Sequence, residues 1–160
     1  MTNRDAFIRI WESVKRPAIE VRETPYDDVL KGSPGFLEIT YAKHRGLLDD
    51  DYMRFDPDGA VLLHDALLWL MRTRNIDDLS SLNSDRIPVV VAQYNLPTAR
   101  SLAEWSPAQG SGAFLAMSKR VLLTEPQLVS LLREFDVALA KEDHEVSLYS
   151  EKFHGKGTAF

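Results

Sequence analysis

Residues 60–71 constrain the fold of this chain most strongly, because ten of these twelve residues are apolar. Only His64 and Asp65 interrupt the run. A helix that is apolar on nearly every side has to be buried on nearly every side, and about 20 residues would be needed to cross a bilayer. The pattern therefore predicts a central core helix over residues 59–74, or a helix that a partner chain covers.

The length and composition of the chain narrow its class. Its 160 residues suit a single domain over residues 1–160. The chain contains no cysteine, which excludes disulfides, thiolate metal sites and cysteine nucleophiles. A formal net charge of −5 argues against a surface for nucleic acid or an anionic membrane. We see no secretory signal or membrane span and expect a cytoplasmic protein.

The periodicity of apolar residues predicts both helices and strands. Thr2 or Asn3 is a suitable cap for a first helix that ends before Pro17. Alternating polar and apolar residues predict a strand over 36–42, and a β-branched run predicts another over 87–92. Further strands are expected at 18–23, 113–123 and 146–149. The pattern indicates an α+β fold, with a small, mostly antiparallel sheet packed with about four helices around the central helix.

The clearest local signal is the sequence Thr-Glu-Pro-Gln at residues 124–127. Threonine at the cap and glutamine three residues later form a capping box, and proline suits the first turn. This signal predicts a helix from Thr124 to about residue 143. A shorter helix is expected over residues 97–105.

An acidic segment precedes the core helix. Asp49, Asp50, Asp51, Asp56 and Asp58 lie within ten residues of one another. Clustered carboxylates can hold Mg²⁺ or Ca²⁺, but the spacing does not match a calcium-binding loop. We favour a turn at residues 56–59 whose aspartates cap the next helix, and we expect no metal and no cofactor.

No catalytic motif stands out among the histidines and serines. His64 adjoins Asp65 within the apolar run, and neighbours on a helix do not normally face each other, so we favour a structural histidine over a general base. Ser111 lies between two glycines but lacks the Gly-x-Ser-x-Gly pattern of a nucleophile elbow. An enzyme is therefore the less expected class.

The favoured hypothesis is a small intracellular protein that acts by binding another protein, such as an inhibitor or immunity protein, an adaptor or an accessory subunit. The candidate interface residues are Asp49, Asp50, Asp51, Trp105 and Gln109. Trp105 borders the loop over 106–112, so we expect its ring to be partly exposed, as in a binding hot spot. An acidic surface favours a basic partner, and a homo-oligomer is compatible with the sequence.

Two alternative functions are also compatible with the sequence. The first is a metal-assisted hydrolase or transferase that uses the carboxylates from Asp49 to Asp58. The second is a DNA-binding regulator, because residues 98–105 and 113–121 faintly resemble a helix-turn-helix unit. Their seven-residue separation is longer than the usual turn.

Overall fold

A computed structural model of the chain describes residues 1–49, 53–74, 76 and 83–156, and it is helical. The helices are α1 (Asn3–Ser13), α2 (Phe36–His44), α3 (Leu63–Thr73), α4 (Ile87–Gln93), α5 (Pro97–Leu102), α6 (Ser111–Ser118) and α7 (Glu125–Lys156), with short 3₁₀ turns η2 (Ser84–Arg86) and η3 (Pro107–Gln109). In the described ranges no sheet forms, and β pairing is limited to isolated bridges between Thr2 and Ala60 and between Leu62 and Leu122. The predicted α+β fold with an antiparallel sheet is therefore wrong.

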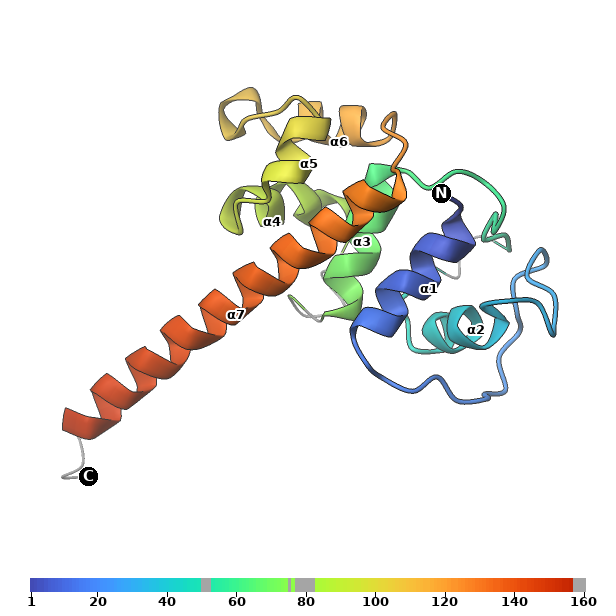
Figure 1. The fold of residues 1–160 in the computed structure, drawn as a ribbon, viewed down its shortest axis with the longest axis horizontal. Helices are drawn as coiled ribbons and strands as arrows, with labels where there is room; N and C mark the ends of the chain where they lie inside the picture. Colours follow the sequence, from blue (N-terminus) through green and yellow to red (C-terminus); the bar gives the residue numbers. More distant parts are fainter. Residues whose placement is uncertain (50–52, 75, 77–82, 157–160) are drawn as a thin grey trace.

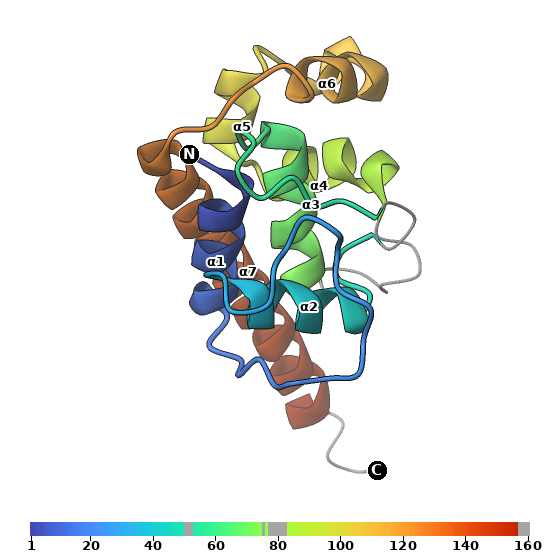
Figure 2. The same ribbon diagram turned by 90° about the vertical axis from the view of Figure 1, so that its right-hand side faces the viewer.

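Helix α3 is the centre of the fold, as its sequence predicts. Every one of its residues except Asp65 is buried. Helices α1, α4, α6 and α7 all contact it, and Figures 1 and 2 show it enclosed by these elements. The core helix is confirmed, although it begins at Leu63 and not at residue 59.

The first apolar residues of the run are extended, because their backbone groups bind neighbours on two sides. Val61 N–H donates to the Met1 carbonyl at 3.0 Å, and the Val61 carbonyl accepts from Leu123 N–H at 3.0 Å. Leu63 N–H, at the start of α3, donates to the Val121 carbonyl at 2.9 Å. Residues 60–62 therefore join the N-terminus of the chain to the segment before α7.

Two predicted strands are helices. Residues 36–42 belong to α2, whose buried positions include Ile39, Ala42 and Lys43, which follow helical spacing and not alternation. Over residues 87–92, the positions buried in α4 include Ile87, Val90 and Val91, again at i, i+3 and i+4. Tertiary burial of these faces overrides the β propensity of the branched residues.

The other three predicted strands are also wrong. Residues 18–23 belong to an irregular loop. Within 113–123, α6 continues to Ser118 and buries Phe114 and Ser118 one helical turn apart. Residues 146–149 lie inside α7, where the side chains are outside the described part of the structure.

The turn over residues 56–59 forms, but it caps α1 and not α3. Gly59 N–H donates to the Asp56 carbonyl at 3.1 Å, which closes the turn. The Gly59 and Pro57 carbonyls then accept from the Asn3 and Arg4 N–H groups, at 2.8 and 3.0 Å. Because the Thr2 hydroxyl accepts from Asp5 N–H, the free donors at the start of α1 are satisfied. The prediction that Thr2 or Asn3 caps this helix is confirmed for Thr2.

Helix α7 begins at the predicted capping box. Gln127 Oε1 accepts from Thr124 N–H at 2.9 Å, and Thr124 Oγ1 accepts from Gln127 N–H at 3.4 Å. The first part of the helix is anchored by buried Leu128, Leu131 and Phe135. The helix then continues past the predicted end near residue 143 to Lys156 and projects away from the other helices (Figure 1).

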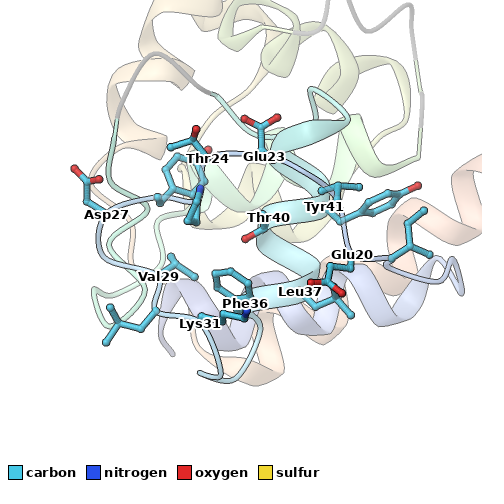
Figure 3. Close-up of a pocket in the computed structure, with 15 residues that line it drawn as sticks. Glu20, Glu23, Thr24, Asp27, Val29, Lys31, Phe36, Leu37, Thr40 and Tyr41 are labelled. Atoms are coloured by element: carbon cyan, nitrogen blue, oxygen red, sulfur yellow. The ribbon is translucent and has the colours of Figure 1, made fainter.

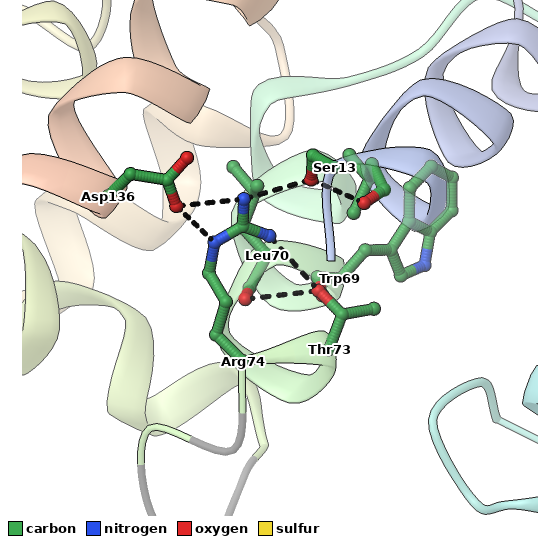
Figure 4. A network of polar contacts seen from close by, with 7 residues as sticks. Ser13, Trp69, Leu70, Thr73, Arg74 and Asp136 are labelled. Atoms are coloured by element: carbon green, nitrogen blue, oxygen red, sulfur yellow. Dashed lines mark hydrogen bonds and ion pairs between the residues drawn. The ribbon is translucent and has the colours of Figure 1, made fainter. Parts of the chain in front are cut away.

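A buried arginine joins α7 to the centre of the fold (Figure 4). Arg74, directly after α3, donates to Ser13 Oγ at 2.9 Å and contacts Asp136 Oδ1 through Nη2 at 3.1 Å. Nη1 lies 3.4 Å from Thr73 Oγ1. Burial lowers the pKa of Arg74, and the carboxylate of Asp136 opposes that effect. One guanidinium therefore connects the ends of α1 and α3 to α7.

We expect Asp136→Ala to destabilise the protein more than the exposure of this carboxylate suggests. The carboxylate is 59% exposed but the Arg74 side chain is only 5% exposed, so the substitution leaves a buried cation without its counter-charge. The expected loss is about 1–2 kcal/mol of unfolding free energy in urea denaturation. The matched control is Asp58→Ala, which removes a surface pair with Arg4 and should cost less than about 0.5 kcal/mol. Equal losses for the two variants would contradict a structural role for the Arg74 network.

Thr124→Ala should cost about 1 kcal/mol, because it removes the oxygen that caps α7. Thr124→Ser keeps that oxygen and should stay within a few tenths of a kcal/mol of the wild type. Chemical denaturation monitored by circular dichroism measures both. A denaturation midpoint that Thr124→Ala does not move would show that the capping box does not stabilise the helix.

Candidate functional site

A groove lies between α2 and the loop that leads into it (Figure 3). Its volume is about 490 Å³. Its apolar walls are formed by the side chains of Ile19, Val21, Leu30, Phe36, Leu37 and Tyr41. In Figure 3, Val29, Phe36 and Thr40 face the space between the loop and the helix. We call this feature the α2 groove.

A buried lysine holds the loop wall of the α2 groove in place. Lys43 lies in the last turn of α2, where a cation is favoured by the helix dipole. Its ammonium donates to the Thr24 carbonyl at 2.6 Å, lies 3.7 Å from a Glu23 carboxylate oxygen, and lies 5.1 Å from the centre of the Tyr26 ring. The irregular segment around Thr24 is thereby fixed relative to the helix.

The loop is also fixed on its other side. The Tyr26 hydroxyl donates to the Asp49 carbonyl, and Asp27 N–H donates to the Met53 carbonyl at 2.7 Å. The Asp28 carboxylate accepts from the N–H groups of Phe55 and Asp56, both at 2.8 Å. These bonds connect the loop to residues 49 and 53–56, in addition to its contacts with α2, so the groove is largely pre-formed.

Gly35 sets the position of α2. It is the N-cap of α2 with φ +81°, a conformation that favours glycine. A Cβ atom built on it would lie 2.9 Å from Ile8 Cδ1 on α1. The absence of a side chain at this position therefore permits the close approach of α1 and α2.

Three large apolar side chains of the groove are exposed. Leu30 is 69% exposed, Ile19 is 56% exposed and Leu37 is 40% exposed. They come from both walls of the same groove. Single exposed apolar residues are ordinary, whereas a group of them around one groove is typical of an interaction surface.

Charged groups at the groove are mostly acidic. Glu20, Glu23 and Asp27 line it together with one cation, Lys31. Figure 3 shows the three carboxylates spread around the edge. Glu23 also lies 3.4 Å from His44 Nδ1, which leaves Glu20 and Asp27 as the carboxylates with no ion pair shown within the described ranges.

One polar atom inside the groove has no partner. Thr40 is 6% exposed, and its Oγ1 makes no hydrogen bond with the described residues. A buried hydroxyl without a partner costs free energy. The Thr40 oxygen itself is buried, so this cost falls on the folded protein.

The predicted acidic residues do not gather in this groove. Asp49 pairs with Arg72 at 3.0 Å and lines a second cavity of about 370 Å³ beside the start of α3. Asp50 and Asp51 lie outside the described residues. Asp58 pairs with Arg4. Across the described ranges no three His, Asp or Glu side chains lie close enough together to hold a metal ion.

Trp105 and Gln109 belong to a different part of the surface and line an open hollow near α5. The expectation that Trp105 is partly exposed is wrong, because it is only 8% exposed. Its ring packs against Phe114 and its Nε1–H donates to the Gly110 carbonyl at 2.8 Å. Gln109 is exposed, and its side chain accepts from Ser106 N–H to cap η3. Both residues stabilise the segment before α6.

His64 contacts its neighbour, contrary to expectation. His64 Nδ1 lies 3.0 Å from Asp65 Oδ1, and Nε2 lies 2.9 Å from Ser84 Oγ. Both residues lie in the first turn of α3, and helical side chains lean toward the N-terminus. Because no turn of α3 precedes these two residues, both side chains can lean past the start of the helix and contact each other. The side chains of His64, Asp65 and Ser84 all line the second cavity.

Comparisons with known proteins give no family assignment. No family model matches the chain, and neither the curated proteins nor the solved structures provide a match. In the part of the chain that the structure describes, no helix is both long enough and apolar enough to cross a membrane.

The α2 groove was not predicted from the sequence. Ile19 and Leu37 both lie in segments predicted as strands, which the structure overturns, and Leu30 lies in a segment with no regular period. One feature of the sequence does indicate the groove, namely large apolar residues in a segment rich in proline and glycine. Such residues lack a helix or strand face that would bury them.

Thr40→Val should leave stability unchanged or raise it by up to about 1 kcal/mol. The substitution keeps the shape of the side chain and removes a buried hydroxyl that has no partner. Thermal unfolding of the isolated protein measures the effect. The control is Thr73→Val, because the Thr73 hydroxyl donates to the Trp69 carbonyl at 2.7 Å and its loss should be destabilising. A clear loss of stability in Thr40→Val would show that the hydroxyl already has a partner.

Proposed function

We propose that this protein binds another protein through the α2 groove. The observation that carries the proposal is the gathering of exposed Ile19, Leu30 and Leu37 around one pre-formed groove. Burying such side chains against a partner stabilises a complex by about 25 cal/mol per Å² of apolar surface, before the costs of association. The proposal keeps the protein-binding class favoured by the sequence and moves the interface to different residues.

The chemistry of the groove favours a particular kind of partner. The apolar walls suit a segment with several apolar side chains, and the carboxylates of Glu20 and Asp27 at the edge suit lysine or arginine beside them. The partner segment is therefore amphipathic and basic.

The test of the groove is affinity capture from native lysate with three forms of the protein. Leu30→Ser removes an exposed apolar side chain in the groove. Leu122→Ser removes one that is 59% exposed elsewhere. A true partner should be captured by the wild type and by Leu122→Ser, and its affinity for Leu30→Ser should fall about 10-fold or more, because burial of a leucine contributes about 1.5–3 kcal/mol. Capture that does not depend on Leu30 would contradict the proposal.

The carboxylates of Glu20 and Asp27, which we call the acidic edge, should affect how fast a basic partner associates. Glu20→Lys and Asp27→Lys should slow association and flatten its dependence on salt, because they remove the steering of a basic segment. Glu12→Lys, an equal charge change on the exposed face of α1, is the control. Binding kinetics at two ionic strengths measure the effect. If the three variants associate alike, the partner does not use the acidic edge.

A further inference from the structure

Ser84, His64 and Asp65 form a continuous chain of hydrogen-bonding contacts. Ser84 Oγ lies 2.9 Å from His64 Nε2, and His64 Nδ1 lies 3.0 Å from Asp65 Oδ1. Ser84 is the first residue of η2, whereas the other two belong to the first turn of α3. The contacts therefore join two elements that are 20 residues apart in sequence.

The contacts determine which ring nitrogen carries the proton in the neutral histidine. An ionised carboxylate can only accept, so Asp65 holds the proton on Nδ1 of His64. The lone pair of Nε2 then faces the Ser84 hydroxyl. This is the arrangement in which a histidine can take the proton of a serine nucleophile while a carboxylate orients the ring.

The surroundings of these residues suit a reaction at Ser84. The His64 side chain is only 10% exposed, which shields it from bulk water, whereas the Asp65 side chain is 40% exposed. Ser84 is half-buried and opens onto the second cavity, whose volume is about 370 Å³. A small molecule in this cavity can therefore reach the serine oxygen.

The other residues of the cavity indicate the class of substrate. Phe55, Leu68 and Trp69 supply apolar walls, and Arg54 and Lys119 supply two cations. Apolar walls suit a short aliphatic or aromatic acyl group. The cations suit negative charge that develops on a carbonyl oxygen during acyl transfer.

We propose that Ser84 is the nucleophile of an esterase site for small carboxylic esters. Ser84 Oγ attacks the ester carbonyl carbon and gives its proton to His64 Nε2. The tetrahedral intermediate collapses, the bond to the alcohol oxygen breaks, and the alcohol leaves with the proton from His64. Water then attacks the acyl-serine and gives a proton to His64, and collapse releases the carboxylic acid and returns the proton to Ser84. Asp65 is a positioning residue throughout.

This proposal rests on the contacts among Ser84, His64 and Asp65, none of which lines the α2 groove, so each proposal can fail without the other. The direct test treats the whole chain with a fluorophosphonate, which forms a covalent bond with activated serines. Intact mass should show one adduct, and peptide mapping should place it on Ser84. No adduct, or an adduct on another serine, would overturn the proposal, and neither result depends on the folding of a variant.

Variants then test the roles of the three residues. Ser84→Ala should abolish labelling, and His64→Gln should slow it about 100-fold or more. Ser33→Ala is the control, because the Ser33 hydroxyl donates to the Leu30 carbonyl and should not affect labelling. Undiminished labelling in a folded His64→Gln variant would also overturn the proposal.

Hydrolysis of p-nitrophenyl acetate supplies the second readout. The wild type should release nitrophenol with an initial burst as the acyl-serine accumulates. Asp65→Asn should lower kcat and change the pH profile of the reaction, which a residue that only supports the fold would not do. A rate that equals that of Ser84→Ala would contradict an esterase site.

Discussion

The nearly complete burial of α3 is the constraint on which the rest of the structure depends. A helix with apolar residues on every side can be stable only when other elements cover every side. Helices α1 and α7 cover it from one direction and α4 and α6 from another. The exception is Asp65, and the second cavity opens beside it. The one position of this helix that is not buried thus coincides with the place where the cover is incomplete.

Buried cations connect the covering elements at the ends of helices. Lys43 in the last turn of α2 holds the loop of the groove, Arg72 in the last turn of α3 pairs with Asp49, and Arg74 after α3 joins α1 to α7. The partial negative charge at a helix C-terminus favours a cation there. Each cation also has oxygen partners, which lowers the cost of removing it from water. These three residues fix the neighbouring loops and helices relative to the ends of α2 and α3.

The sequence predicted those parts of the fold whose signals are local and chemical. The Thr2 cap, the capping box at Thr124 and the all-round apolar helix each depend on residues close together in the chain, and all three are confirmed. The strand predictions failed for residues 36–42 and 87–92 because a short apolar run fits both periods. Burial against distant elements decides between a helix and a strand, as in the contact of α2 with α1 and of α4 with α3.

The two sites could not be predicted from the sequence because they depend on such distant contacts. Ser84 meets His64 only after α3 and η2 have packed together, and Leu30 and Leu37 line one groove only once Lys43 has fixed the loop. The two proposed sites share one lining residue. Tyr26 lines both the α2 groove and the second cavity, and its hydroxyl binds the Asp49 carbonyl. A partner in the groove and a substrate in the cavity would therefore contact the same side chain.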